Sequence, residues 1–520
     1  MNGNATEPEI TEPNMRALLG SVGLDVEYLR AEGNTLVQAG ADGEDVAVLD
    51  HVGGYGSLLL GHNNPEIVAH AKKLLDARTP VHIQFSRHSS ANRLALALNR
   101  ILHRELETTE DYLAFFASTG AEAVETAIKH AELDRRMRIG ALIAEIDSHV
   151  EEVRAASRSG SASVPGSVQA ELGVSGPEEL IAHVRAHNEA LLAKPPLFLA
   201  LEGSFHGKLA GSVQLTHNPV VRDPFQALAA QARFVPIDRP DALAKVVDSE
   251  QAALLDLTID AGVVTVAPRN YPVFTAFLVE PVQGEGGINV LSEEFTTQLR
   301  RTADALDVPV VVDEIQCGMG RTGTFLAGSA VGLRGDYYTL AKSLGGGIAK
   351  ISILLIRQAK YRPEFEFLHS STFAKDGFST AIALKVVELL EAEDGAAYRR
   401  AAELGARLKS ALDGVAADFP GVVKAVRGKG LMLGLEFEDQ TGSPSEPVRA
   451  AALQGILGYV IAGYLLREHR IRIFPTASAP NTLRFEPSLQ LTDEEIEQTA
   501  TALRAVSAIL RDRPDRIFQP

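Results

Sequence analysis

The sequence predicts an α/β protein in which a mostly parallel sheet is covered by helices on both faces. Runs that are apolar throughout alternate with helical patterns along the middle of the chain. These runs are "YLAFFAS" (112–118), "PLFLALEG" (196–203), "FTAFLV" (274–279) and "VPVVVD" (308–313). Strands that are apolar on both sides are typical of parallel sheets, because helices then cover both faces.

Three of these runs end in polar residues. Ser118, Thr119 and Gly120 end the first run, Glu280 follows the third, and Asp313 ends the fourth. Ligands of open α/β sheets bind beyond the carboxyl ends of the strands. The acid at the end of the valine-rich run therefore predicts a ligand site at this edge of the sheet.

Composition and charge favour a cytoplasmic protein. Of 520 residues, 45% are hydrophobic and 22% charged, which is typical of globular proteins. The net charge of −17 argues against nucleic acid and anionic membranes as partners. With Cys317 as the only cysteine and no zinc-ligand spacing, we expect neither an internal disulfide nor a metal site. We find neither a signal-peptide pattern nor an 18-residue apolar stretch.

We expect a large and a small domain. Residues 1–80 would form an N-terminal segment that belongs to the small domain, and residues 81–375 the large domain. A long helical pattern after residue 376 leads to mixed strand and helix patterns, so residues 376–520 would complete a smaller α+β domain.

Residues 134–195 have the pattern of a helical insertion in the large domain. An apolar stripe at helical spacing precedes the break "RSGSASVPGS", and Ser175 with Glu178 predicts a capping box at the start of a second helix. The stripe consists of Ile139, Leu142, Ile143, Ile146, Val150 and Val153. Two hypotheses remain open, namely a surface decoration and a cap over the entrance of the ligand site.

Lys342, in "YYTLAKSLGGG", is the candidate nucleophile, because a buried lysine has a lowered pKa and reacts with carbonyl groups. Pyridoxal 5'-phosphate (PLP) needs such a lysine and a carboxylate facing its pyridine nitrogen, a role that fits Asp313. Its phosphate fits a strand-to-helix turn such as the one at 119–121. Phe205 and His206, in "EGSFHGK", offer an aromatic face for the ring.

Five motifs together resemble the class III (omega-type) aminotransferases of PLP fold type I. "SFHGK", "LVEPVQGEGG", "VVVDEIQCGMGRTG", "LAKSLGGG" and "HSSTF" occur in the order typical of that family. The resemblance runs from about residue 30 to 510, apart from the insertion. It implies a large domain with a mostly parallel, seven-stranded sheet, a smaller α+β domain, and PLP as the cofactor.

The resemblance implies a role for each residue around the cofactor ring. Lys342 would form the Schiff base and move the proton, and Asp313 would hold the pyridine nitrogen. Gln316 would reach the phenolic oxygen. Phe205 would stack on the ring, with His206 beside it.

The resemblance also implies the phosphate site and a homodimer with shared active sites. Thr119, Gly120 and Ala121 would bind the phosphate, and Glu280 would help to hold the strand end around the aspartate. Thr372, in "HSSTF", would reach the phosphate of the neighbouring subunit.

Four residues are candidates for substrate binding by the same resemblance. Arg484, in "TLRFEP", would take the carboxylate of an amino acid donor, and Glu285, in "QGEGG", would pair with it when no carboxylate is present. Tyr55 and Phe85 would lie near the entrance, with ordinary packing as the alternative. Arg321 is expected to order its loop.

Two departures from the family pattern stand out. Cys317 occupies a position where threonine or serine is common; packing behind the cofactor and a reactive thiol are both open. "HSSTFAKDGF" lacks the glycine-asparagine-proline that often follows the threonine.

The function implied is transfer of an amino group from an amino acid such as glutamate or alanine to an aldehyde or ketone, by a ping-pong mechanism through pyridoxamine phosphate. The insertion favours a bulky natural-product acceptor. The alternatives are an ornithine-, acetylornithine- or diaminobutyrate-type aminotransferase, and a same-fold decarboxylase, racemase or aminomutase. A protein kept for interaction only would have lost Lys342 or Asp313, and a serine hydrolase would need a GxSxG motif, which we do not find.

Overall fold

The computed structural model describes residues 11–40, 43–83, 86–87, 89–228, 231–512 and 514–518. Its centre is a seven-stranded sheet with the strand order β4-β12-β11-β10-β9-β5-β6. All strands run in parallel except β12, which is antiparallel to both of its neighbours. The strands are β4 (Tyr112–Ala117), β5 (Leu197–Leu201), β6 (Gln231–Val235), β9 (Phe274–Val279), β10 (Val310–Asp313), β11 (Tyr337–Leu340) and β12 (Ser352–Arg357). The predicted α/β class with a mostly parallel sheet is confirmed.

Helices cover both faces of this sheet, as the apolar strands predicted. On one face, α5 (Gly120–Ser159) packs against side chains such as Val311 and Leu278. On the other face, Val310 and Val312 pack toward α4 (Ser89–Leu106), α10 (Glu293–Ala305) and α12 (Gly377–Asp418). Neighbouring valines of β10 therefore point to opposite cores, and both cores exclude water from the strand.

Two smaller sheets flank the large one. The first has the order β1-β2-β3-β15 and joins both ends of the chain, since β15 pairs with β3 in parallel. The second has the order β13-β14-β17-β16. Their strands are β1 (Tyr28–Glu32), β2 (Thr35–Ala39), β3 (Asp45–Asp50), β13 (Val423–Lys429), β14 (Met432–Phe437), β15 (Ile471–Arg472), β16 (Phe474–Pro475) and β17 (Thr482–Phe485).

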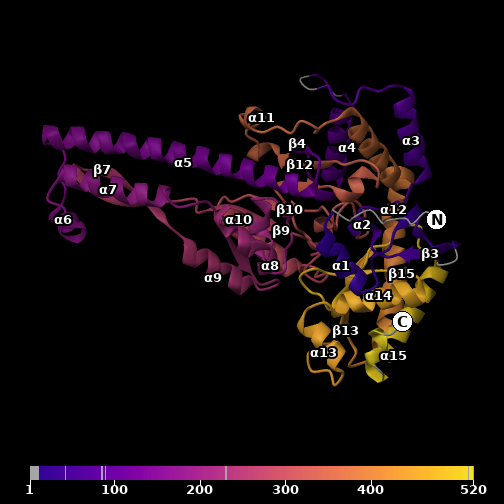
Figure 1. Cartoon of the computed structure of the whole chain (residues 1–520). Helices are drawn as coiled ribbons and strands as arrows, with labels where there is room; N and C mark the ends of the chain where they lie inside the picture. Colours follow the sequence, from indigo (N-terminus) through magenta and orange to yellow (C-terminus); the bar gives the residue numbers. More distant parts are fainter. Residues whose placement is uncertain are drawn as a thin grey trace.

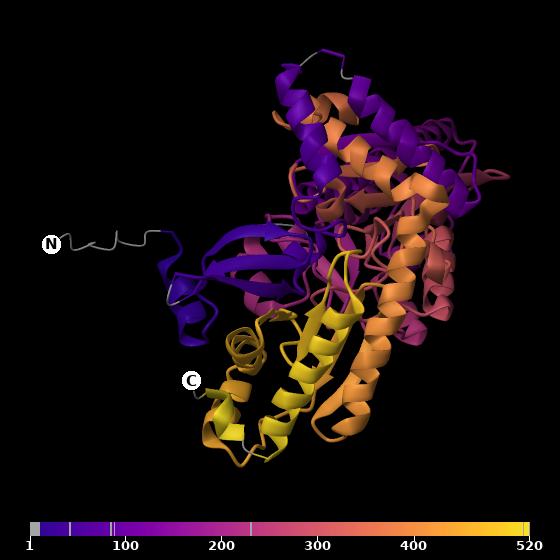
Figure 2. The ribbon, with the colours of Figure 1, turned by 90° about the vertical axis from the view of Figure 1, so that its right-hand side faces the viewer.

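The remaining helices lie around these sheets. Figure 2 shows α12 running past α4 and then along α15, so it spans the large sheet and the C-terminal region. It is broken at residues 392–395, where the backbone leaves helical geometry. The other helices are α1 (Pro13–Ser21), α2 (Gly53–Gly56), α3 (Pro65–Asp76), α8 (Pro219–Arg222), α9 (Pro240–Glu250), α11 (Phe365–Leu368), α13 (Glu446–Leu453), α14 (Leu457–His469) and α15 (Asp493–Asp512). Within the described ranges no single helix is long and apolar enough to cross a membrane; α13 and α14 pass that test only as a pair bent by 119°, on length and composition alone.

The insertion forms an arm, which we define as residues 139–192 together with 252–273. Figure 1 shows it extending away from the large sheet. The predicted apolar stripe lies in a separate core, packed against α7 (Pro177–Leu192) and the hairpin of β7 (Ala253–Asp260) and β8 (Val263–Asn270). The short α6 (Gly166–Leu172) lies between α5 and α7.

Three details of the insertion differ from the prediction. The first helix does not start anew near residue 134, because α5 continues without a break from the sheet into the arm. The capping box was paired wrongly: α7 begins after Gly176, and the Ser175 N–H donates to Glu179 rather than pairing with Glu178. The hairpin was missed, although Asp260-Ala261-Gly262 between two alternating runs is a turn signal.

Truncating a buried side chain of the arm core tests whether the arm folds on its own contacts. Leu180 is fully buried there, so Leu180→Ala is expected to cost the arm about 2–5 kcal/mol through lost packing and the cavity left behind. Hydrogen exchange should speed up across the arm and not in β9 to β11. Leu192→Ala, at a residue 36% exposed, is the matched control and should change arm exchange little. Uniform loss of protection across the whole chain would contradict an independent arm core.

Candidate active site

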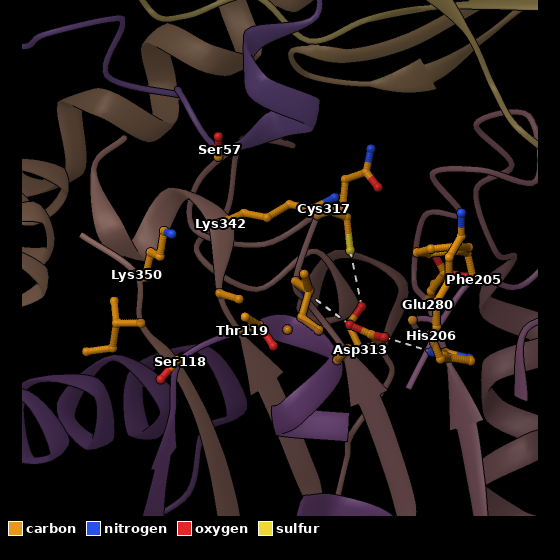
Figure 3. Close-up of a pocket in the computed structure, with 18 of the residues that line it drawn as sticks. Ser57, Ser118, Thr119, Phe205, His206, Glu280, Asp313, Cys317, Lys342 and Lys350 are labelled. Carbon is orange, nitrogen blue, oxygen red and sulfur yellow. Dashed lines mark hydrogen bonds and ion pairs between the residues drawn. The ribbon is translucent and has the colours of Figure 1, made fainter. Parts of the chain in front are cut away.

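A cavity of about 550 Å³ lies at the carboxyl ends of the central strands. It is lined by nine of the ten predicted cofactor residues, namely Thr119, Gly120, Ala121, Phe205, His206, Glu280, Asp313, Gln316 and Lys342. Figure 3 shows Phe205, His206 and Glu280 grouped on one side of Asp313, and Lys342 and Thr119 on the other. The strand ends therefore gather residues that are more than 200 positions apart in sequence.

Asp313 is the last residue of β10 and is 4% exposed. One carboxylate oxygen accepts hydrogen bonds from the Thr339 hydroxyl of β11 (3.1 Å) and the Ile315 N–H (3.2 Å). The other oxygen lies 2.7 Å from Nδ1 of His206. These three donors hold the Asp313 carboxylate at a defined position. Without such hydrogen bonds, removing this charge from water would be costly.

His206 is held in place by the loop that follows β5. Its backbone N–H donates to Thr216 (3.0 Å), and the neighbouring Phe205 N–H donates to Glu280 (3.0 Å). Burial alone would lower the pKa of His206, but the hydrogen bond and the charge of Asp313 raise it above its usual value. A protonated His206 compensates Asp313 from the side away from Lys342. Burial, together with the Asp313 charge, raises the pKa of Glu280 to about 7.

The start of α5 provides an anion site. Thr119 caps the helix, and the carboxylate of Glu122 accepts from the N–H groups of Ser118 (2.7 Å) and Thr119 (2.9 Å). Gly120 and Ala121 supply the first amides of the helix, which have no acceptor within it. Gly207 packs against these first residues of α5 with φ at +116°, and a Cβ at this position would lie 2.7 Å from the Ala121 side chain. The chain thus leaves the helix end open toward the cavity.

Lys342 follows β11 and reaches into the cavity (Figure 3). Its φ is +46°, a left-handed value that is unusual for a side chain of this size. Burial lowers the pKa of its amine, while the negative charges of Glu486 and Glu285 oppose that shift. The amine is therefore more nucleophilic at neutral pH than a surface lysine.

Two of the predicted substrate residues, Glu285 and Arg484, form a bidentate ion pair beside the cavity. The Nη1–Oε1 and Nη2–Oε2 distances are 2.5 and 3.0 Å, and Arg484 is 2% exposed. Burial alone would raise the pKa of Glu285, but the Arg484 charge holds it below its usual value. The ring of Tyr55 lies 4.7 Å from the guanidinium carbon of Arg484. The structure thus brings Glu285 and Arg484 together and places Tyr55, which was predicted near the entrance, against Arg484; none of the three lines the cavity itself.

Two predicted residues are not part of this cluster. Thr372 is exposed and does not line the cavity of its own chain. Phe85 lies outside the described residues.

Two loop residues behave as structural groups. Arg321 is fully buried and donates to the carbonyl oxygens of Leu431, Pro487 and Gly56, so it orders its loop as expected. Cys317 is buried, and burial raises the pKa of its thiol well above the usual value. Its sulfur lies 3.5 Å from a carboxylate oxygen of Glu314, so the thiol is held as a protonated donor, although Cys317 also lines the cavity.

Several cavity residues had no predicted role. Ser57, at the end of α2, and the exposed Lys350 line the cavity, and so does Lys208 of "SFHGK". Glu486 is buried next to the Gln316 amide. Lys208 and Glu486 stood inside recognised motifs, but no pattern tells which way a motif side chain points.

The chemistry of this donor set fits PLP. A lysine amine, a fixed carboxylate, an aromatic face and an open helix N-terminus surround one cavity, and these are the groups the aldehyde, pyridine nitrogen, ring and phosphate of PLP need. The fold and the site together define a PLP-dependent enzyme of fold type I.

Comparison with known proteins places the chain within this class. The family model "Aminotransferase class-III" matches residues 20–506, and the chain belongs to this family. The protein is a PLP-dependent aminotransferase, and its cofactor is pyridoxal 5'-phosphate.

Solved structures share the fold. An ornithine aminotransferase from Toxoplasma gondii is 20% identical with a TM-score of 0.67, and 97% of each chain is covered. An omega transaminase from Pseudomonas jessenii in complex with PMP is 19% identical with a TM-score of 0.68, covering 97% of this chain and 96% of that one. An amine transaminase from an uncultivated Pseudomonas species in its PLP-bound form is 22% identical with a TM-score of 0.66, covering 96% of this chain and 97% of that one. These similarities concern the fold and leave the substrate open.

Glu314 provides a pH test of the strand end. Its fully buried carboxyl accepts from the N–H groups of Ala327 (2.9 Å) and Gly328 (2.8 Å), and burial raises its pKa from 4.5 to about 7. The folded chain therefore binds this proton more tightly than the unfolded chain. Its contribution to stability is fully present below pH 4.5 and is lost as the pH rises through about 7.

In Glu314→Gln this part of the pH dependence should vanish. Between pH 4.5 and 7 the wild-type free energy of unfolding should fall by about 3 kcal/mol more than that of the variant. Urea unfolding of the cofactor-free protein at several pH values measures this difference. Glu494→Gln, on the exposed side of α15, is the control and should keep the wild-type slope. Parallel profiles for Glu314→Gln and wild type would contradict the pKa assignment.

Proposed function

We propose that the protein transfers the amino group of an α-amino acid, such as glutamate or alanine, to an aldehyde or ketone in two half-reactions through pyridoxamine phosphate. The observation that supports this proposal is the buried Glu285–Arg484 pair beside Lys342. An enzyme that moves an amino group from an α-amino acid to an acceptor without a carboxylate must accommodate both kinds of substrate in the same place.

The ion pair suits that requirement. With a donor bound, its carboxylate replaces Glu285 as the partner of Arg484. With an acceptor that lacks a carboxylate, Glu285 stays, and the guanidinium charge is not left buried without a partner. Glu285 is also held by the Ala477 N–H (2.7 Å), and Arg484 by the Pro475 carbonyl (3.2 Å), so both resting positions are defined.

The chain's own groups then handle the protons. The Lys342 amine, with its lowered pKa, would hold the cofactor through its aldehyde group and could accept and return the proton of the substrate carbon. Asp313, supported by His206, would hold a proton on the pyridine nitrogen. PLP, when bound, supplies a ring that withdraws electrons from the substrate carbon.

We propose a bulky carbonyl compound of natural-product assembly as the acceptor. The cavity has polar groups outside the cofactor set, Ser57 and Lys350, that a large acceptor would contact. The insertion does not supply the contact within one chain, because no residue of 134–195 lines the cavity. An ornithine-type activity is the second candidate, because ornithine aminotransferases are among the proteins of the same fold.

A spectral titration tests the donor. L-Glutamate or L-alanine should bleach the long-wavelength absorption band of the PLP-loaded protein, and a panel of bulky aldehydes should restore it. Faster bleaching by ornithine through its distal amine would select the second candidate. Release of carbon dioxide would select the decarboxylase. A protein that takes up no PLP would contradict the whole assignment.

Arg484→Lys should separate carboxylate recognition from chemistry. Losing a bidentate, charge-assisted contact is expected to lower kcat/KM for the preferred α-amino acid by roughly 30-fold. An amine donor without a carboxylate should lose less than threefold. Arg472→Lys, which alters the part-buried Arg472–Asp50 pair (2.9 Å), is the control. Equal losses for both donor types would show that Arg484 does not bind the carboxylate.

We propose further that the active unit is a homodimer in which Thr372 completes the phosphate site of its partner. Supporting this, Thr372 is exposed on its own chain, and large apolar side chains near it are exposed too, namely Phe367 (91%), Leu368 (63%) and Phe373 (63%). Such a group of apolar side chains is typical of a surface that another chain covers.

Thr372→Ala should weaken PLP binding about tenfold, through the loss of a hydrogen bond to a charged phosphate. Fluorescence titration of the cofactor-free protein measures the dissociation constant, and light scattering after gel filtration measures the mass. Ser371→Ala, one position away, is the control and should bind PLP as the wild type does. A monomer with full PLP affinity would overturn the shared site.

A further inference from the structure

Glu486 is a buried carboxylate beside the cavity with no role assigned so far. It follows β17 and is fully buried. Its Oε1 accepts a hydrogen bond of 2.8 Å from Nε2 of Gln316, whereas its Oε2 is buried without a hydrogen-bond partner among the described residues. Gln316 lines the cavity. A buried carboxylate that is only half satisfied is costly, so its retention here needs a reason.

The Gln316–Glu486 contact lies in a slot made by two glycines. A Cβ at Gly56 would lie 2.9 Å from the Glu486 carboxylate and 3.4 Å from Cγ of Gln316. A Cβ at Gly284 would lie 2.2 Å from the Gln316 side-chain oxygen. Larger residues at either position would displace the pair, so the chain provides room for these two side chains and little else.

The chemistry of the contact fixes the direction of the amide. A carboxylate accepts hydrogen bonds and cannot donate them, so the Gln316 NH₂ group must face Glu486. The amide oxygen then lies over Gly284, as the distances above require. One N–H is used by Glu486, and the second N–H of the same nitrogen remains for a ligand in the cavity.

We propose that Glu486 is a positioning residue that fixes the Gln316 amide with its second N–H directed at the phenolic oxygen of PLP. Without an obligate acceptor at position 486, the amide can turn over and present its oxygen to that phenolic oxygen, where two acceptors would repel. Glu486 is itself held by its backbone N–H, which donates to the His51 carbonyl (2.7 Å). This inference needs the cofactor only and does not depend on the donor or acceptor proposed above.

A second role of the same carboxylate must be separated from this one. The negative charge of Glu486 also acts on its cationic neighbours Arg321, Lys342 and Arg484. A carboxylate kept only as a counter-charge would not depend on the amide of Gln316. The positioning role and the counter-charge role therefore predict different effects of Glu486 variants on PLP binding once Gln316 is removed.

The test is a double-mutant cycle on PLP binding. Glu486→Gln and Glu486→Asp are made in the wild type and in Gln316→Ala, and PLP dissociation constants of the cofactor-free proteins are measured by fluorescence. Glu486→Gln removes the obligate acceptor. Glu486→Asp keeps the charge but withdraws the carboxylate by one methylene. Both should raise the dissociation constant at least fivefold when Gln316 is present, and less than twofold when it is absent, because contacting residues couple strongly.

A spectroscopic measurement complements the double-mutant cycle and requires no catalytic turnover. In the PLP-loaded protein, the pH midpoint of the long-wavelength absorption band should move for both Glu486 variants with Gln316 present, and by a smaller amount in Gln316→Ala. Glu105→Gln is the matched control: its carboxylate accepts from the Phe325 and Leu326 N–H groups (both 2.9 Å) and does not line the cavity. Melting temperatures of all proteins show whether each one folds.

The proposal is overturned by equal effects in both Gln316 backgrounds, which would leave only the counter-charge role. It is also overturned if Glu486→Asp binds PLP as the wild type does, since that variant keeps the charge and loses the contact. Glu486→Asp keeps the test decisive if Glu486→Gln does not fold. Failure of the wild type to bind PLP would contradict the family assignment and is recognised before any variant is compared.

Discussion

The hydrogen bond between Asp313 and His206 is the contact on which the rest of the site depends. A carboxylate at the end of a fully buried strand is stable only where donors meet it, and here they come from three places: His206 after β5, Thr339 on β11, and the chain immediately after Asp313. Because β5, β10 and β11 run in parallel, their carboxyl ends lie at one edge and their loops can share one charge. The order of the strands therefore determines where this buried carboxylate meets the cavity.

Charge balance then explains the arrangement around the cavity. At the end of β10, Asp313 is compensated by His206, while Glu280 has its pKa raised to about 7 and can stay neutral. On the opposite side Glu285 pairs with Arg484, and Glu486 lies among Lys342, Arg321 and Arg484. Each buried cation thus has an acid near it, which keeps a low-dielectric site from carrying a large net charge. Lys342 keeps a lowered pKa because burial, together with the Arg484 charge, outweighs the carboxylates of Glu486, Glu285 and Asp313.

The sequence predicted the chemistry better than the shape. Asp313, Lys342 and the turn at 119–121 could be found because a polar residue that ends an apolar strand has few structural explanations. The continuous α5 was missed because the apolar stripe of residues 139–153 was assigned to a separate helix. The structure shows that one helix runs from the sheet into the arm, and Gly140 within it is exposed with open space around it. A glycine inside a helix costs only about 1 kcal/mol and does not end it. Glu486 could not be assigned, since its direction depends on room left by Gly56 and Gly284, both remote in sequence.

The course of α5 limits what the arm can do. The helix starts beside the cavity and has 40 residues, so at 1.5 Å per residue it is about 60 Å long and its far end lies well away from the cavity. The arm has its own apolar core and its own polar contacts, in which the buried carboxylate of Asp256 on β7 meets the part-buried side chains of His149 on α5 (3.0 Å) and Arg269 on β8 (2.7 Å). Removing residues 134–195 alone would leave the β7–β8 hairpin without the helices that cover it. The arm is built from two segments of the chain that pack on each other, so it has to be treated as one unit. Within one chain it connects to the cavity through α5, whose first residues line the cavity, and through β5 and β9, which follow α7 and the β7–β8 hairpin.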